Sequence, residues 1–453
     1  MKTIFLKELV PYSIEYLIKK MNLSEDSFYN FMEKLELNKI LVYKASNKYV
    51  FKYVGIIQYK HIVVYFIPKY ISKTENEIVI KQILKLFRVY SKKETLDEEE
   101  FMSLGNITQR DNTNLISIID FLVADYINHG LYRNDREINK YNGHGEINWQ
   151  RTISKCNAYI LNNQPVYLGY YTKRTVIDEE DYIREVHKYA LDKSTDFMIQ
   201  TGLLDYFGYP KIKYDISKSD LGTTEYILDK IESELYAQYS DRKQLLLIAL
   251  YSFIAREKVK SSDRSLVMYG TRNFNIVWEK INKFVFDDEY NIYKEFIQKP
   301  IWKDNYNNVL VPSDERRNKT LEPDILKCIN VRDKSIFFII DAKYYNIYFK
   351  DEYVFNNPGI SDLTKQYLYQ LALDKLCNEK EIDNIYNVLI FPKDDLDEIN
   401  KLGEVAVPFL KDLGLNNIKL VHLPAYKIID LYINNLKYNK DSMNTFADIV
   451  NNY

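Results

Sequence analysis

Cysteine is scarce in this chain of 453 residues, which has three, at Cys156, Cys328 and Cys377. They lie far apart, and none belongs to a C-x-x-C pair or lies near a pair of histidines. This spacing argues against both a structural zinc site and a disulfide framework. The five histidines are also scattered, so they suggest no histidine-based metal or catalytic site. A reducing, cytoplasmic environment fits such cysteine usage best.

Long apolar runs are absent as well. The longest, LLLIALYSFIA at 245–255, is about half the length of a membrane span. The N-terminal MKTIFLKELVPYS is interrupted by Lys7 and Glu8 before the apolar region of a signal peptide could form. We therefore expect neither export nor membrane insertion.

No glycine of the thirteen is followed by lysine, so the sequence contains no P-loop and is not expected to hydrolyse nucleoside triphosphates in that manner. A large excess of either charge is missing too: the net charge is -2 and the pI is near 6.3. Any contact with nucleic acid must then be local. With 46% apolar residues, the chain is long enough for two or three domains, each with its own core.

The first part of the chain has helical and then β patterning. Apolar residues repeat at helical spacing over 14–21 and 28–35, and Ser24 is placed to cap the second helix. Residues 40–70 are rich in β-branched and aromatic residues, which predicts strands. Helices followed by a hairpin predict a small winged-helix-like region over residues 1–75.

The remaining chain changes character at a polar stretch. Residues 76–260 are predicted to be mainly helical, with a loop at 138–148, and to engage DNA or a partner protein. The polar residues 256–265 mark the main boundary. Residues 261–453 are predicted to form a mixed α/β domain of sheet and flanking helices. Its helices are expected at 274–281 and 361–376, and its strands near 322–329, 336–344, 384–392 and 418–423, with 336–344 at the centre of the sheet.

One segment of this last domain carries charged residues in a pattern that suggests chemistry. In IFFIIDAK, five apolar residues precede Asp341, and strand alternation directs Asp341 and Lys343 to the same side. Pro323 is tolerated at the start of a strand, so Asp324 could reach Asp341 from a neighbouring strand. Two adjacent carboxylates repel each other unless a cation lies between them, and such oxygen ligands favour Mg²⁺. The simpler reading is a pair of ordinary strands joined by a turn.

The whole set of motifs resembles the PD-(D/E)xK nucleases, and more closely the McrC-like subunits of the LlaJI restriction endonuclease family. The segments that carry the resemblance are MYGTRNFNIVWEKI at 268–281, LEPDI, IIDAKYY and NPGISDLTKQYLYQLAL at 357–373, with YVGIIQYKHIVVYFIPKY and GHGEINWQRTI before them. The resemblance spans about residues 40–425. It implies a catalytic set of Glu279, Asp324, Asp341, Lys343 and Gln366, in which Glu279, Asp324 and Asp341 bind the metal, and it leaves Tyr369 and Gln370 as further candidates.

Some of these residues have plainer interpretations. Glu279 could be a solvated charge on an amphipathic helix, and Gln366 could simply cap or solvate its helix. Glu322 is also acidic, but strand alternation turns it away from an ion held by Asp324, so we leave it out of the site.

The function that the resemblance implies is a Mg²⁺-dependent endodeoxyribonuclease subunit of a McrBC-like or LlaJI-like restriction system. Such a subunit cleaves double-stranded DNA beside a separate McrB-like AAA+ GTPase, which fits the missing P-loop. Two other functions stay open. One is a non-catalytic adaptor that activates the motor, and the other is a standalone repair or recombination nuclease of the same fold.

Acidic residues are absent between Glu36 and Glu75, where seven lysines occur. Lys44, Lys48 and Lys52 fall on the expected hairpin, which makes them candidates for contacting DNA phosphates. The same lysines could instead protect a sheet edge from aggregation, or form a surface for the motor.

Overall fold

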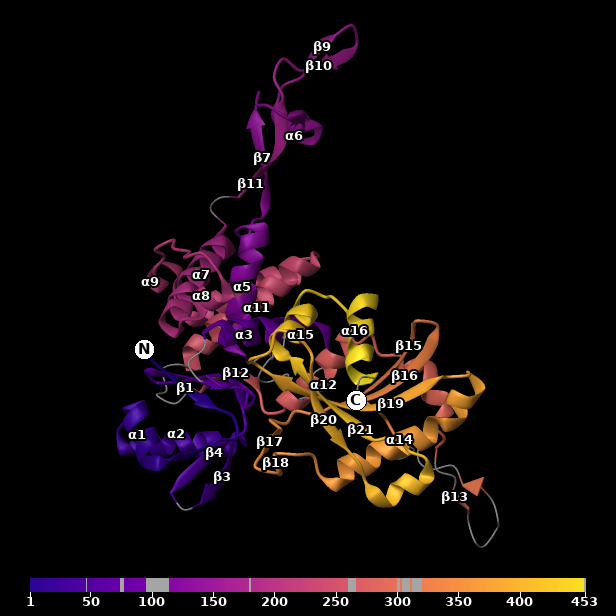
Figure 1. Ribbon diagram of the computed structural model, residues 1–453. Coiled ribbons are helices and arrows are strands. Elements are labelled where there is room, and N and C mark those ends of the chain that lie inside the picture. The colour runs from indigo at the N-terminus through magenta and orange to yellow at the C-terminus, as the bar shows by residue number, and fades with distance from the viewer. Residues whose placement is uncertain are drawn as a thin grey trace. The chain divides into compact units, whose positions relative to one another are not determined.

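The structure is a computed structural model. It describes residues 1–45, 47–73, 77–94, 114–178, 181–259, 266–299, 302–303, 310–311 and 320–451. The chain divides into two compact units, and the second is inserted into the first (Figure 1). Unit 1 comprises residues 1–104 and 268–453, and unit 2 comprises residues 105–267. The sequence analysis instead expected the three consecutive ranges 1–75, 76–260 and 261–453.

After two strands that were not expected, unit 1 contains the expected helix pair and hairpin. Ser24 caps the second helix, because its Oγ accepts a hydrogen bond of 3.4 Å from the backbone N–H of Ser27. The hairpin of β3 and β4 is joined by β2 into a three-stranded sheet. The elements are β1 (Lys2–Lys7), β2 (Pro11–Ser13), α1 (Ile14–Met21), α2 (Glu25–Leu37), β3 (Leu41–Ala45), β4 (Lys48–Phe51), β5 (Val54–Tyr59) and β6 (Ile62–Ile67).

A second sheet of unit 1 has the order β1-β6-β5-β12, where β12 (Val267–Thr271) is the first strand after unit 2. The backbones of β5 and β12 approach closely at Gly55 and Gly270. A Cβ at Gly55 would lie 2.3 Å from the carbonyl oxygen of Tyr269, so only glycine permits this approach. Helix α3 (Glu77–Lys93) packs against β6.

The C-terminal part of unit 1 is a five-stranded mixed sheet with the order β15-β16-β19-β21-β20. Strands β16, β19 and β21 are parallel, and the two edge strands run antiparallel to their neighbours. Its elements are α12 (Phe274–Val285), α13 (Tyr290–Tyr293), η1 (Lys294–Phe296), β13 (Trp302–Lys303), β14 (Leu310–Val311), β15 (Ile325–Val331), β16 (Lys334–Ala342), β17 (Tyr348–Lys350), β18 (Tyr353–Phe355), α14 (Ile360–Glu379), β19 (Asn384–Lys393), β20 (Asn400–Val405), η2 (Pro408–Leu413), β21 (Ile418–Pro424), α15 (Ala425–Ile433) and α16 (Lys440–Asn451).

The sequence analysis expected the strand that carries Asp341 to lie at the centre of this sheet, and this was wrong. Strand β16 is second in the order, and β19 is central. The reason lies in the connection: β15 and β16 form a tight antiparallel hairpin, which places β15 at the edge, whereas the helix α14 returns the chain to lay β19 on the other side of β16.

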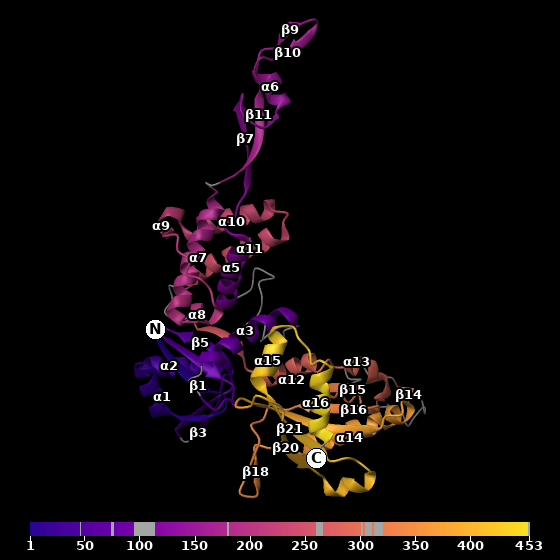
Figure 2. The same ribbon diagram turned by 45° about the horizontal axis from the view of Figure 1, so that its top comes forward.

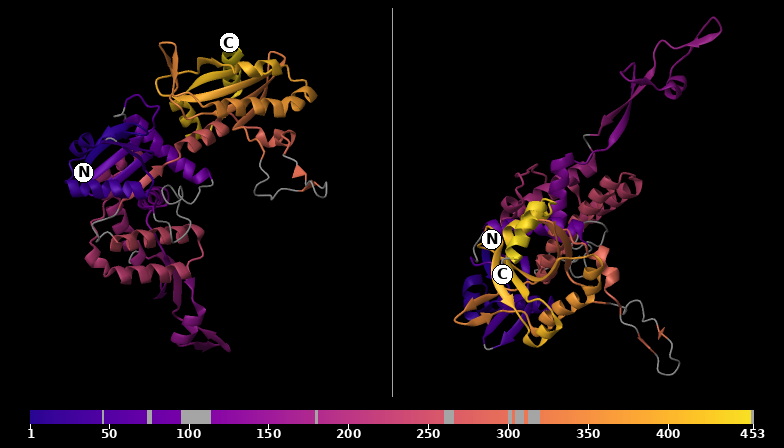
Figure 3. Two further views of the ribbon diagram at one scale, coloured as in Figure 1. Left: turned by 90° about the horizontal axis from the view of Figure 1, so that it is seen from below. Right: turned by 45° about the vertical axis from the view of Figure 1, so that its right-hand side comes forward.

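The two faces of β16 are covered by different helices. On one face Phe337 and Ile339 join a buried cluster with Leu373 of α14. On the other face Phe338 packs against Phe446 of α16, with ring centroids 5.3 Å apart. Figure 3 shows α14 and the C-terminal helix on opposite sides of the sheet. Since alternate residues share a face, Asp341 continues the face that α14 covers.

Unit 2 consists of helices and an extended β insertion. Its helices are α5 (Leu115–His129), α7 (Tyr182–Thr201), α8 (Leu203–Phe207), α9 (Lys218–Leu221), α10 (Thr224–Ala237) and α11 (Asp241–Val259). Arg242 makes two hydrogen bonds with the buried carboxylate of Asp125, which ties α11 to α5. We call residues 135–177 the arm. It comprises β7 (Asp135–Tyr141), β8 (Glu146–Ile147), α6 (Trp149–Lys155), β9 (Tyr159–Leu161), β10 (Gln164–Val166) and β11 (Tyr171–Ile177).

The arm corrects the prediction of a loop at 138–148 within a mainly helical region. Residues 135–141 form a strand that pairs with β11 along its whole length, and β8 pairs with β11 as well. The strands were missed because the arm buries few of its side chains, so its apolar residues show no clear alternation between a buried and an exposed face. In Figure 2 the arm extends away from the helices of unit 2.

No helix within the described ranges is both long and apolar enough to cross a membrane.

Candidate active site

Two neighbouring strands bring Asp324 and Asp341 together. In the β15–β16 hairpin Ile325 lies opposite Ile340, so the residue before β15, Asp324, faces Asp341. The Asp324 Oδ2 accepts a hydrogen bond of 2.8 Å from the backbone N–H of Ala342, and its carboxyl is also hydrogen-bonded to that of Asp341. Burial and the adjacent Asp341 raise the pKa of Asp324 well above its usual range. The two carboxyl groups therefore do not readily ionise together without a nearby positive charge.

Lys343 lies beside the pair, on the side that alternation predicted. Its Nζ is 2.7 Å from Asp341 Oδ2 and 3.0 Å from Asp362 Oδ1. Burial alone would lower the pKa of Lys343, but the carboxylates of Asp341 and Asp362 raise it above the usual range. Lys343 is thus a fixed positive charge at the carboxyl-terminal end of β16.

Glu279 comes from α12, which lies against β16. Val277, Trp278 and Ile281 of this helix are fully buried, so the helix is anchored in the core while Glu279 remains half-buried. Burial, followed by the nearby Asp341, raises the pKa of Glu279. The charge of Glu279 thus acts on the aspartate pair. Within the part of the chain that the structure describes, no three acidic, histidine or cysteine side chains converge into a set that could hold a metal ion.

Gln366 fastens α14 to β16. It is fully buried, and its Nε2 donates a hydrogen bond of 2.6 Å to the backbone oxygen of Ile339, two residues before Asp341. Two further contacts hold the same helix: Tyr369 Oη donates to the backbone oxygen of Glu322, and Gln370 accepts from Asn387 Nδ2. The Glu322 side chain is exposed.

Asp362 is the residue of this site that sequence reasoning missed. It lies in the first turn of α14, one helical turn before Gln366, and its carboxylate is the second charged partner of Lys343. The signal was available in the spacing, because an acidic residue four positions before Gln366 shares its helix face. What the spacing could not show is that this face meets the end of β16.

The three lysines of the β3–β4 hairpin, which we call the lysine hairpin, differ in their exposure to solvent. Lys48 is exposed at the start of β4, whereas Lys52, just after β4, is half-buried and its charge acts on Glu8 and Lys69. Lys44 lies in β3, and its side chain is outside the described part of the chain. Lys48 is thus the described lysine of the three that faces solvent.

Comparison with known proteins shows the family to which the chain belongs. The sequence model of the LlaJI restriction endonuclease family matches residues 53–428. This chain belongs to that family. A curated relative of this LlaJI-family chain, the type II restriction enzyme BsuMI component YdjA of Bacillus subtilis strain 168, is 31% identical over 431 residues, which cover 92% of this chain and 88% of the relative.

Two solved structures are also similar to this LlaJI-family chain. One is the assembly of Thermococcus gammatolerans McrB AAA+ hexamers with bound McrC, with 14% identity, a TM-score of 0.41, and coverage of 96% of this chain and 99% of the other. The second is the Thermococcus gammatolerans McrBC complex, with 13% identity, a TM-score of 0.27, and coverage of 58% and 89%. As a restriction endonuclease family member, the chain is a component of a restriction system.

Proposed function

We propose that this chain is the DNA-cleaving subunit of its restriction system, an endodeoxyribonuclease of the PD-(D/E)xK type. The observation that carries the proposal is the convergence of Asp324, Asp341 and Lys343 at the end of β16. These are the residues that the family resemblance implied, and they come from two strands of one mixed sheet. The same proposal includes a winged-helix-like fold for residues 1–75.

The chemical type of the donors, rather than a closed ligand set, points to Mg²⁺. All three acidic side chains supply hard oxygen ligands, and the soft donors of the described chain lie elsewhere. The raised pKa values of Asp324 and Glu279 support a divalent cation, because such an ion would let carboxylates that crowd one another ionise together. Asp324 and Asp341 would hold the ion directly, with Glu279 as the third acidic group. When bound, Mg²⁺ would lower the pKa of a coordinated water and neutralise charge on the scissile phosphate.

The residues of the chain supply the remaining parts of the reaction. Lys343 brings a positive charge that can bind a non-bridging phosphate oxygen or orient the attacking water. The Ala342 N–H fixes the orientation of the Asp324 carboxylate, and Gln366 fixes α14 against β16. Hydrolysis by a water held in this way needs no covalent intermediate.

The proposal includes a separate motor protein, because the sequence contains no P-loop. We propose that a separate McrB-like AAA+ GTPase supplies nucleotide hydrolysis and that the substrate is double-stranded DNA. The arm of unit 2 suits a partner surface, because it exposes large apolar side chains that a chain acting alone would not need to present to water. Those with an exposed fraction above one half are Tyr141, Trp149, Ile153, Tyr159, Ile160, Leu161 and Leu168.

The test is to purify the full chain alone and together with a McrB-like AAA+ GTPase of the same organism, and to assay cleavage of double-stranded DNA with and without GTP and Mg²⁺. We expect efficient cleavage only when chain, motor, GTP and Mg²⁺ are all present. GTPase stimulation without any cleavage would favour a non-catalytic adaptor. Efficient cleavage by the chain alone, independent of nucleotide, would favour a standalone repair or recombination nuclease.

A further inference from the structure

Lys343 is shared between two carboxylates that belong to different elements. Asp341 lies two residues earlier on the same strand, at 2.7 Å, and Asp362 lies in the first turn of α14, at 3.0 Å. All three side chains are largely withdrawn from water: 7% of Asp341, 16% of Lys343 and 25% of Asp362 is exposed. Ion pairs this sheltered are far less screened than surface pairs.

The two carboxylates are not equivalent. Asp341 belongs to the proposed metal site and is hydrogen-bonded to Asp324. A divalent ion on Asp341 would compete with Lys343 for the same oxygen and would repel its ammonium group. Asp362 is outside the proposed metal-binding set, so it can keep Lys343 when Asp341 turns to the ion.

The position of Asp362 is fixed by the helix that carries it. One turn further along α14, Gln366 Nε2 donates a hydrogen bond of 2.6 Å to the backbone oxygen of Ile339 in β16. Tyr369 Oη, on the same helix, donates a bond of 3.0 Å to the backbone oxygen of Glu322. These anchors hold the first turn of α14 beside the end of β16. An acidic residue in the first turn is also favourably placed at the positive end of the helix dipole, which suits Asp362 to this position.

We propose that Asp362 is a positioning residue: it holds Lys343 beside the metal site and frees Asp341 to bind the divalent ion. This inference rests on the proposed function and adds to it a residue that the family motifs did not supply. Without the negative charge of Asp362, Lys343 would pair with Asp341 alone and would oppose metal binding there.

The experiment measures Mg²⁺ binding to the purified full chain by calorimetry, without DNA and without cleavage. We expect Asp362→Asn, which keeps the shape of the side chain but removes its charge, to weaken Mg²⁺ binding by about tenfold, the usual effect of losing a residue that orients a metal site. Asp362→Glu should restore most of the affinity. The matched control is Asp374→Asn, an exposed aspartate of the same helix, which should bind Mg²⁺ as the wild type does.

Testing Asp362→Asn in a variant that already lacks Lys343 distinguishes the positioning of Lys343 from a simple loss of negative charge near the metal site. In Lys343→Met, the side chain that Asp362 positions is gone, so adding Asp362→Asn should change the Mg²⁺ affinity no further. A tenfold loss that persists in Lys343→Met would overturn the inference, as would an unchanged affinity in Asp362→Asn alone. A wild-type chain that takes up no Mg²⁺ would overturn the proposed metal site and this inference with it, whereas normal wild-type uptake with an unaffected Asp362→Asn overturns the inference alone.

Discussion

The hydroxyl of Tyr344, the residue that follows Lys343, donates a hydrogen bond of 2.7 Å to the carboxyl group of Glu8, in the turn directly after β1. Glu8 is 2% exposed, and burial raises its pKa. The backbone N–H of Lys69 also donates to the Tyr344 hydroxyl, at 3.3 Å. The first residues of the chain are thereby bonded to the strand end that carries the candidate active site.

Removing this hydroxyl should destabilise unit 1. In Tyr344→Phe the buried Glu8 loses one of its two donors and keeps the backbone N–H of Lys69, so we expect the free energy of unfolding to fall by about 1–3 kcal/mol, measured by denaturant unfolding of the full chain. Tyr348→Phe, in the exposed hairpin strand β17, is the matched control and should change the stability by less than about 0.5 kcal/mol. Equal midpoints for the two variants would show that the Glu8–Tyr344 bond contributes nothing.

Substitution of Asp341 or Lys343 should abolish cleavage and spare the fold. Asp341→Ala and Lys343→Ala each remove a group from the strand end, beyond the apolar run that packs β16. We expect a loss in cleavage rate of more than two orders of magnitude, roughly 3 kcal/mol or more in the barrier, in an assay with motor and GTP. Binding to the motor should be retained. Full cleavage activity in Asp341→Ala would contradict the nuclease assignment.

Acid should destabilise unit 2 through His187. This histidine is fully buried, its Nδ1 accepts a hydrogen bond of 3.0 Å from the backbone N–H of Tyr132, and burial lowers its pKa to about 4. Between the unfolded pKa of about 6.5 and the folded value, the unfolded chain takes up a proton that the folded chain refuses, so stability falls as the pH is lowered through this window and is fully present above it. The total loss should approach about 3 kcal/mol.

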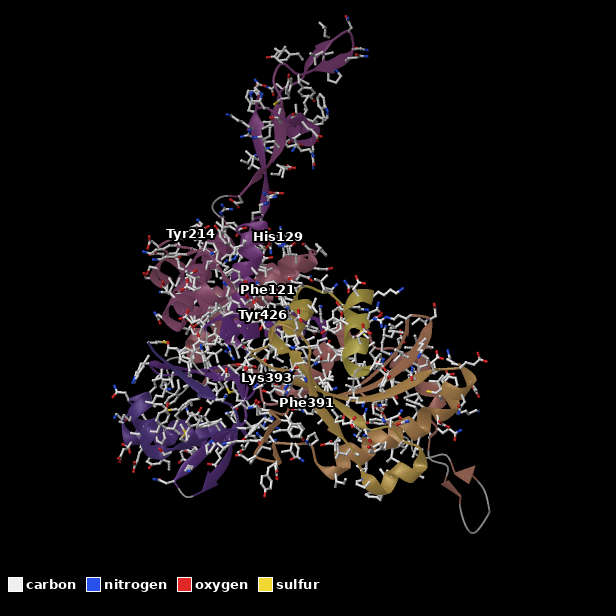
Figure 4. All side chains as sticks on the ribbon, in the orientation of Figure 1. Phe121, His129, Tyr214, Phe391, Lys393 and Tyr426 are labelled. Carbon is white, nitrogen blue, oxygen red and sulfur yellow. The ribbon has the colours of Figure 1, made fainter. Side chains whose placement is uncertain are left out.

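The measurement is denaturant unfolding at several pH values across that window. His187→Gln, whose amide oxygen can still accept from Tyr132, should flatten the dependence of stability on pH. His129→Gln is the control, because His129 is exposed at the end of α5 (Figure 4). The assignment fails if wild type and His187→Gln lose the same stability on acidification.

The salt dependence of DNA binding tests whether the lysine hairpin contacts DNA phosphates. If it binds phosphates, replacing Lys44, Lys48 and Lys52 by alanine should weaken DNA binding across sequences and flatten the dependence of log K on log salt by roughly two to three units. A triple alanine variant of exposed lysines elsewhere in unit 1 is the control, at Lys334, Lys375 and Lys380. An unchanged salt slope with lost GTPase stimulation would assign the hairpin to the motor, and no change in either would leave it as a solvated sheet edge.

The sequence predicted the parts of the site that depend on the β15–β16 hairpin alone. Asp341 and Lys343 share a side because strand geometry alternates, and Asp324 reaches them because the hairpin places it opposite Asp341. Asp362 could not be predicted in this way, because its contact with Lys343 depends on how α14 lies across the sheet. The same limit applies to the order of the strands, in which β19 and not β16 is central. The helix pair of residues 14–37 was predictable because it carries strong apolar spacing and a serine cap.

The insertion of unit 2 between α3 and β12 has a consequence for biosynthesis. In the β1-β6-β5-β12 sheet, β5 gains its outer neighbour only after Val267–Thr271 has been made and has left the ribosome, which happens after the whole of unit 2 has been synthesised. Until then the nascent chain carries β5 as an open strand edge, the kind of edge through which strands of different chains join. A product whose translation stops within unit 2 therefore lacks β12 and keeps this edge of β5 open to other strands.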